Sequence, residues 1–185
     1  ILIQKKDLPI KIFKLLTFDF KKENTKDTKK DITNIIKSQF ISDVPIALSL
    51  SGGFDSNIIY KVMRENLNKE KYQIYSFYFH DYEKFNKDFN IAKKNCENFG
   101  DSINQIEICF KEYQNNIEKV SEILEEPICN QCSILNYVMA KNIREKVIMT
   151  GDGGDEIFGG YDHYKSAYIM QTLSKINIFK NIFNF

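Results

Sequence analysis

Short apolar segments alternate with amphipathic segments along most of this 185-residue chain, and this alternation constrains its fold more than any other feature. Strands are predicted for the apolar segments, at residues 46–50, 73–79, 103–109 and 147–150. Helices are predicted at residues 31–40, 58–67, 85–99, 113–124 and 133–143, and Asp31 is the predicted N-cap of the first. Apolar strands that alternate with helices form a parallel sheet with helices on both faces. The sequence therefore predicts an α/β fold with one doubly wound parallel sheet.

Composition narrows the range of partners. The 26 basic residues nearly balance the 25 acidic ones, so the totals show no basic face for nucleic acid. No apolar run approaches the roughly 20 residues that a membrane span needs. Four cysteines occur without a preceding signal peptide, which favours a reduced compartment. We therefore expect a soluble, cytoplasmic protein with small-molecule partners and neither nucleic acid nor membrane among them.

The motif SGGFDS, residues 51–56, follows the first predicted strand and precedes a helix. At this junction of a parallel sheet, free N–H groups and the positive end of the helix dipole favour an anion. Gly52 and Gly53 let the backbone approach phosphate oxygens, and the Ser51 and Ser56 hydroxyls can donate to them. Asp55 would repel phosphates unless a cation such as Mg²⁺ lay between. The alternative is a tight strand-to-helix turn that needs glycine for backbone reasons alone.

A second cluster, TGDGGDEIFGGYDHY at residues 150–164, follows the last predicted strand and favours the functional interpretation. It contains five glycines together with Asp152, Asp155 and Glu156. Because parallel strands end at the same edge of a sheet, both loops should meet there. Asp55 and Asp155 could then share one cation.

These two motifs resemble those of a known family. SGGFDS looks like the pyrophosphate-binding loop of the N-type ATP pyrophosphatases, also called the PP-loop superfamily. Together with TGDGGDEIFGGY it resembles the synthetase domain of asparagine synthase and related amidotransferases. SDVPIALSLSGGFDS and EEPICNQCSILNYVMAKNIREKVIMTGDGGDEIFGGY are similar to the family's approaches to the two loops. The resemblance covers about residues 31–165, and it implies the fold of the adenine nucleotide alpha hydrolases.

The resemblance also implies a chemistry. Such domains bind ATP with Mg²⁺, adenylate a carboxylate, release pyrophosphate and let ammonia displace AMP to form an amide. The implied ATP-binding residues are Ser49, Ser51, Gly52, Gly53, Asp55, Ser56, Phe79, Thr150 and Gly151. Asp55 and Asp155 match the Mg²⁺ ligands. Asp152 is the candidate catalytic residue, at a position where asparagine synthases commonly have Glu, which leaves the acceptor open.

The resemblance further implies a domain organisation. Residues 1–30, with TFDFKKEN at 17–24, resemble the linker or tail of a preceding glutaminase domain that supplies ammonia from glutamine. Residues 31–185 are then a synthetase domain truncated at its C-terminus. The family has a phosphate-contacting lysine farther downstream, so this piece is expected to bind ATP without making an amide alone. A homodimer is the candidate assembly of the full-length protein.

Three functions follow from these implications. The simplest is asparagine synthesis from aspartate. The alternatives are amide formation on another carboxylate, such as a sugar acid or a peptide, and a non-catalytic nucleotide-binding remnant.

Other polar residues carry weaker signals. Cys129 and Cys132 have C-x₂-C spacing, but four-coordinate zinc needs two more ligands and the chain has no second pair. We interpret them as small, partly buried residues at a helix start. His80 is interpreted as a polar residue at the exit of a strand, with contact to the nucleotide as the alternative, and the same two interpretations apply to His163.

Overall fold

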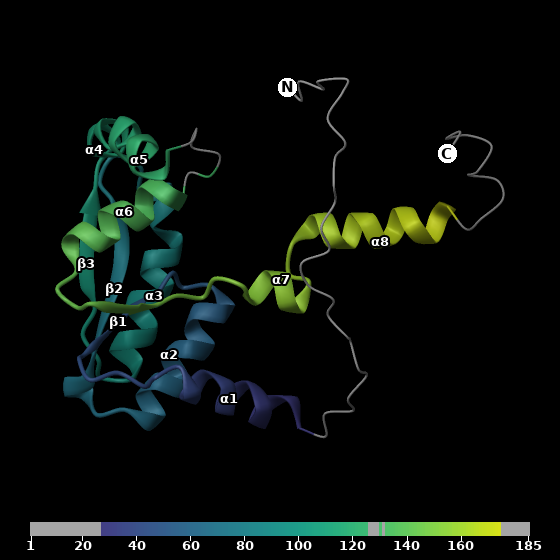
Figure 1. Cartoon of the computed structure of the whole chain (residues 1–185), viewed down its shortest axis with the longest axis horizontal. Coiled ribbons are helices and arrows are strands. Elements are labelled where there is room, and N and C mark those ends of the chain that lie inside the picture. The colour runs from purple at the N-terminus through teal and green to yellow at the C-terminus, as the bar shows by residue number, and fades with distance from the viewer. Residues whose placement is uncertain (1–26, 126–129, 131, 175–185) are drawn as a thin grey trace, which may run out of the picture.

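The computed structural model describes residues 27–125, 130 and 132–174 of the chain. Its centre is a sheet of four parallel strands in the order β3-β2-β1-β4 (Figure 1). The strands are β1 (Ile46–Ser49), β2 (Tyr72–Phe79), β3 (Asn104–Ile108) and β4 (Val147–Met149). In the register, Ile46 pairs with Tyr72 on one side of β1 and with Val147 on the other. This confirms the predicted parallel sheet, and each strand lies within one residue of its predicted start and end.

Helices precede, connect and follow the strands. In chain order they are α1 (Thr28–Ser38), α2 (Phe54–Asn66), the 3₁₀ turns η1 (Lys69–Lys71) and η2 (Glu83–Asn86), α3 (Lys87–Asn98), α4 (Phe110–Asn115), α5 (Ile117–Leu124), α6 (Cys132–Asn142), α7 (Gly154–Phe158) and α8 (Asp162–Ser174). None of these helices has the length and apolar content to span a membrane.

Three helix predictions were wrong in detail, and one of them is the start of α2, which begins at Phe54 instead of residue 58. The N-cap of α1 is Asp27, whose Oδ1 accepts a hydrogen bond from the Lys30 N–H, and Asp31 lies inside the first turn. The helix expected at 113–124 is divided into α4 and α5 at Asn116. Where α4 ends, the Glu112 carbonyl accepts from the Asn116 side chain at 2.8 Å and from the Asn116 main-chain N–H at 3.3 Å.

The sheet carries a separate apolar core on each face. Alternate residues of β1 point to opposite faces, so Ile46 and Leu48 belong to one core and Ala47 to the other. The first core includes Tyr60 and Met63 of α2 and Ala92 and Cys96 of α3, whereas the second includes Val138 and Met139 of α6. Helices therefore cover both faces, and the predicted doubly wound arrangement is confirmed (Figure 1).

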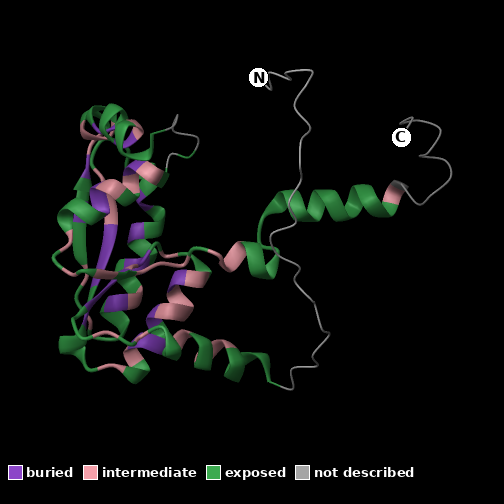
Figure 2. Cartoon of the chain, viewed as in Figure 1, coloured by how far each residue is buried: buried purple, intermediate pink, exposed green. Residues whose placement is uncertain are grey.

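Strand order locates the functional edge of the sheet. From β1 the chain passes to β2 and β3 on one side, and it returns to β4 on the other side of β1. Such a reversal opens a crevice at the carboxyl ends of the two strands where the winding changes direction, β1 and β4. The loops after β1 and β4, which contain the two glycine-rich motifs, begin at this position. The buried residues lie in the sheet and its covering helices, whereas α8 is exposed over residues 162–172 (Figure 2).

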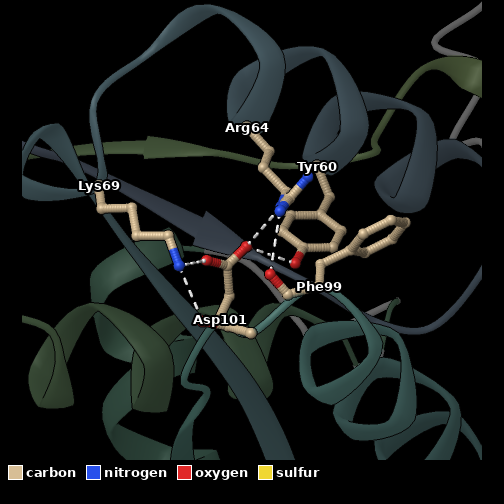
Figure 3. Close-up of polar contacts among 6 residues, drawn as sticks. Tyr60, Arg64, Lys69, Phe99 and Asp101 are labelled. Atoms are coloured by element: carbon tan, nitrogen blue, oxygen red, sulfur yellow. Dashed lines mark hydrogen bonds and ion pairs between the residues drawn. The ribbon is translucent and has the colours of Figure 1, made fainter.

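The opposite edge of the sheet is held by a charged cluster around Asp101 (Figure 3). Its carboxylate, nearly fully buried, accepts hydrogen bonds from Tyr60 Oη at 2.7 Å and Arg64 Nε at 3.0 Å and pairs with Lys69 Nζ at 2.7 Å. Burial alone would raise the pKa of Asp101, but the hydrogen bonds and charges of Lys69, Tyr60 and Arg64 outweigh it and hold the pKa below its usual value. Arg64 also donates to the Phe99 carbonyl at 2.9 Å. The cluster ties α2 to the loop that precedes β3.

Candidate functional site

A cavity of about 550 Å³ lies between the two glycine-rich loops. Nine of the predicted site residues line it: Ser49, Ser51, Gly53, Asp55, Ser56, Thr150, Gly151, Asp152 and Asp155. The structure thus brings together residues from two motifs that lie about 100 positions apart in the chain. Gly52 and Phe79 are not part of the lining.

The two serines of the first loop hold that loop in shape. The Ser56 hydroxyl is buried and donates to the Gly53 carbonyl at 3.1 Å. Its single hydrogen is used there, so the 3.0 Å contact between Ser51 Oγ and Ser56 Oγ is donated by Ser51. Ser51 Oγ also lies 3.3 Å from the Gly53 N–H, which donates to it. Both hydroxyls are therefore paired within the loop, and their predicted role toward phosphate stays a prediction.

The two adjacent glycines of the first loop, Gly52 and Gly53, have different structural roles. Gly52 has a φ of +79°, and a Cβ built on it would collide with the main-chain carbonyl of Asp88 in α3. This position needs glycine for both conformation and space. Gly53 is the N-cap of α2 in extended conformation, and a Cβ there would meet only Ser51 Oγ, at 3.3 Å. Gly52 thus fits the turn interpretation, while the exposed Gly53 is the one that lies open to a ligand.

The second loop packs directly on the start of α2. A Cβ built on Gly151 would lie 3.0 Å from the Ser56 main-chain nitrogen, and one on Gly154 would lie 2.5 Å from Asp55 Oδ2. Only hydrogen atoms at these positions let the loops approach so closely. The Asp55 carboxylate therefore lies between the first helical turns of α2 and α7.

Three carboxylates line the cavity: Asp55, Asp152 and Asp155. Thr150 Oγ1 donates to Asp152 Oδ2 at 2.9 Å, which orients Asp152 within its own loop. The Asp155 side chain lies against the backbone of Gly160, which also lines the cavity. Among the described residues no group of three or more acidic, histidine or cysteine side chains is arranged to hold a metal. A cation here would accordingly rest on fewer protein ligands plus those of a bound substrate, the usual pattern for Mg²⁺.

Phe79 ends β2 with its main chain occupied. Its N–H donates to Asn86 Oδ1 at 2.7 Å, and its carbonyl accepts from Asn86 Nδ2 at 2.9 Å. Asn86 is almost completely buried and extends the hydrogen bonding of β2 beyond the end of β1. The expectation that Phe79 lines the nucleotide stays a prediction.

The histidines and cysteines in the described part of the chain lie outside the cavity lining. His80 Nε2 pairs with Glu107 at 2.6 Å, and His163 stacks on Tyr161 with ring centroids 5.1 Å apart. Cys132 is exposed at the start of α6, and Cys129 falls outside the described residues. The exposure of Cys132 differs from the predicted partial burial. Cys132 is the first residue of α6, and it belongs to neither apolar core.

Sequence reasoning missed several lining residues: Phe54, Asn136, Gly154, Phe158 and Gly160. Three of these, Gly154, Phe158 and Gly160, belong to the second motif, whose glycines were noted as a group and of which only Gly151 was assigned to ATP. Asn136 comes from α6, where it is an exposed amide in an otherwise mainly apolar helix. That isolated polar residue was the one available signal.

Comparisons with known proteins agree with this geometry. The profile of the asparagine synthase family matches residues 28–181. A provisionally named asparagine synthetase (glutamine-hydrolysing) 2 of Methanocaldococcus jannaschii is 30% identical over 170 residues, covering 88% of this chain and 31% of that protein. Asparagine synthetase (glutamine-hydrolysing) 1 of Bacillus subtilis is 28% identical over 154 residues, covering 82% and 24%. The chain thus spans only about a quarter to a third of the length of these relatives.

A solved structure shares the fold. The glutamine-dependent NAD⁺ synthetase of Acinetobacter baumannii, determined in complex with ADP, superposes with a TM-score of 0.50 at 13% identity. The superposition covers 73% of this chain and 28% of that one. The likeness confirms the predicted fold class, that of the adenine nucleotide alpha hydrolases.

Proposed function

The chain belongs to the asparagine synthase family, and from this premise we propose that it is the ATP-binding part of an amide-forming ligase. In the proposed reaction a carboxylate is adenylated, pyrophosphate leaves and ammonia displaces AMP. Aspartate is the proposed acceptor, with asparagine as product. The names of the relatives, which include glutamine hydrolysis, support glutamine as the source of ammonia and a glutaminase domain as the partner of this one.

One observation carries the proposal above all others. A single cavity at the carboxyl edge of the sheet is bounded by SGGFDS and by TGDGGDEIFGGY, with the N-terminus of α2 at its wall. The first N–H groups of α2 have no acceptor within the helix and carry its positive dipole end. This supports the triphosphate of ATP as the group that binds beside Gly53.

The acidic side chains fit a cation. Asp55 and Asp155 line the same cavity from opposite loops, and carboxylate oxygens are the ligands that Mg²⁺ prefers. We propose these two residues as its protein ligands. When bound, Mg²⁺ would neutralise the charge that develops on pyrophosphate as it leaves.

The protein groups have distinct proposed roles. The α2 N–H groups bind and orient the phosphates, holding the α-phosphorus for attack by the acceptor carboxylate. Attack by ammonia then leaves a nitrogen that must lose a proton. Asp152 is the lining carboxylate that is not assigned to the cation, and Thr150 holds its side chain in place. We propose Asp152 as the base that accepts this proton.

The first test removes one carboxylate at a time. Asp55→Asn and Asp155→Asn should each weaken Mg²⁺-dependent ATP binding by roughly tenfold or more, because contacts to charged groups contribute about 1.5–3 kcal/mol. Calorimetry with ATP and Mg²⁺ measures the effect. Asp43→Asn is the matched control, since Asp43 is exposed and lies before β1, at the other edge of the sheet. Unchanged metal dependence in both site variants would exclude the shared cation.

The second test separates the candidate reactions. The full-length protein is incubated with ATP, Mg²⁺ and ammonium, and pyrophosphate release is measured with aspartate, a sugar acid or a peptide carboxylate. Stimulation by aspartate with formation of asparagine supports the proposal. Stimulation by another acceptor would reassign the substrate, and ATP binding without pyrophosphate release under any condition would identify a non-catalytic remnant.

A further inference from the structure

The side chain of Asn57 connects the first glycine-rich loop to α3. Its Nδ2 donates to the Gly53 carbonyl at 2.7 Å, and its Oδ1 accepts from Asn95 Nδ2 at 2.8 Å. The same carbonyl accepts from the Asn57 main-chain N–H at 3.2 Å and from Ser56 Oγ at 3.1 Å. The contact from Asn57 Nδ2 is therefore the shortest of three that converge on one carbonyl oxygen.

The chemistry of these groups leaves one orientation for both amides. A main-chain carbonyl can only accept, so Asn57 must present its NH₂ group to Gly53. Its oxygen then faces α3, and Asn95 must in turn present an NH₂ group. Turning either side chain over would place oxygen against oxygen or nitrogen against nitrogen. The amide orientations of Asn57 and Asn95 are thus both fixed by the Gly53 carbonyl.

Helix α3 supports the loop at two points on one face. The Asp88 carbonyl lies against Gly52, and Asn95, seven residues later, holds Asn57. Positions seven apart lie two turns apart on the same side of a helix. Since α3 also contributes Ala92 and Cys96 to the core beneath the sheet, its position is well defined. The hydrogen bond between Asn57 and Asn95 therefore fixes the first glycine-rich loop relative to α3.

The orientation of the Gly53 carbonyl decides what the loop presents to a ligand. In a trans peptide the Phe54 N–H points opposite to the Gly53 carbonyl. Holding the carbonyl along α2 therefore aims the Phe54 N–H away from the helix, and Phe54 lines the cavity. Gly53, which precedes this peptide, resists rotation about its own ψ only weakly. Without the Asn57 side chain, only the two longer hydrogen bonds would hold the Gly53 carbonyl, and the peptide could turn more easily to present a carbonyl oxygen to an anion.

We propose that Asn57 is a positioning residue of the ATP-binding loop, supported by Asn95, an inference that rests on the proposed function. Asn57 holds the Gly53–Phe54 peptide with its N–H directed at the phosphates. It does not line the cavity itself and acts through Gly53. Replacing Asn57 should therefore weaken binding of the phosphate end of the nucleotide and leave binding of the adenosine end unchanged.

The test compares Asn57→Ala, Asn95→Ala and the double variant in the full-length protein, using ATP, inorganic pyrophosphate and adenosine as separate probes with Mg²⁺. Asn57→Ala should raise the Kd of ATP and of pyrophosphate about tenfold and leave that of adenosine unchanged. Asn95→Ala should have a smaller effect in the same direction. The double variant should resemble Asn57→Ala, because both residues act along one chain of contacts.

A matched control exists in the same helix. Asn66 Nδ2 donates to the Val62 carbonyl at 2.6 Å, with the same four-residue separation as Asn57 and Gly53, but at the far end of α2. Asn66→Ala removes an equivalent bond and should leave all three affinities unchanged. Wild-type affinity for ATP in Asn57→Ala would overturn the inference, as would an equal loss for adenosine and ATP. If the wild-type protein itself bound no ATP, the proposed function would fail instead.

Discussion

Single residues at the cavity show how closely the two loops depend on each other. Asp55 is the predicted cation ligand, and its carboxylate is in contact with the backbone of Gly154. Gly154 was missed by sequence reasoning although it stands one residue before Asp155. The position of Asp55 thus depends on the absence of a side chain at Gly154.

Gly154→Ala should accordingly weaken ATP binding. Its added methyl group would stand 2.5 Å from Asp55 Oδ2, so the carboxylate or the loop would have to move. We expect the Kd of ATP with Mg²⁺ to rise by roughly tenfold or more, with overpacking costing about 1–3 kcal/mol at this contact. Isothermal calorimetry checks the affinity.

Gly100→Ala is the matched control for this change. Gly100 has a φ of +67° with no atom within 4 Å of a built Cβ, and it lies at the other edge of the sheet. Its substitution should lower the melting temperature through backbone strain and leave ATP affinity unchanged. If both glycine variants lost affinity equally, direct contact with Asp55 would not be the cause.

At the scale of elements, α2 joins the two edges of the sheet. Its N-terminus forms the wall of the cavity, and its later residues Tyr60 and Arg64 bind Asp101 at the opposite edge. Lys69, just after the helix, completes the cluster. The position of α2, and with it that of the loop, is therefore anchored about three turns from the cavity.

Asp101→Asn should destabilise this anchor by about 1–3 kcal/mol, because it leaves two cations and a hydroxyl with a weaker partner. The folded-state pKa of Asp101 lies below its ordinary value of 3.8. Its stabilising contribution is thus complete above about pH 4 and is lost as pH falls through the folded pKa. Denaturant unfolding should show a constant wild-type advantage at neutral pH that shrinks below pH 4. An advantage independent of pH down to pH 2 would contradict the assignment.

At the scale of the whole molecule, the cavity depends on strand order. β1 and β4 are far apart in sequence but adjacent in the sheet, and the reversal of winding between them brings their loops together. A ligand that contacts both loops therefore connects the end of β1 to the end of β4. Such a ligand binds the folded state alone, because the unfolded chain has no cavity.

ATP with Mg²⁺ should therefore stabilise the folded protein. At a ligand concentration one hundred times Kd the gain is about 2.7 kcal/mol, which raises Tm by roughly 5–10 °C for a chain of this size. Differential scanning calorimetry with ATP, with and without EDTA, measures it. Chelation should abolish most of the shift, and a shift of the same size in EDTA would argue against a cation at Asp55 and Asp155.

Local features of the sequence were sufficient for the fold class and for most of the cavity. Alternating apolar segments predict strands and helices because their periodicity is a property of neighbouring residues. SGGFDS and TGDGGDEIFGGY could be assigned to one edge because all parallel strands end on the same side. Six of the lining residues follow from that reasoning, namely Ser51, Gly53, Asp55, Ser56, Asp152 and Asp155, whereas Ser49, Thr150 and Gly151 were predicted from the resemblance to asparagine synthase. The N-cap of α1 and the division of a helix at Asn116 could not be predicted in this way. Asp27 and Asp31 have the same side chain, and which of them caps α1 depends on where the chain turns.

Contacts between distant residues were decided only by the tertiary structure. Asn57 meets Asn95 across 38 positions and Tyr60 meets Asp101 across 41, and no local pattern distinguishes these pairs from other polar residues of the chain. Gly154 and Asp55 lie still farther apart in the chain. A sequence specifies which groups can donate, accept or carry charge. Which of them meet depends on the packing of α2, α3 and the loop after β4 around one sheet, where a shift of a few ångströms changes every partner.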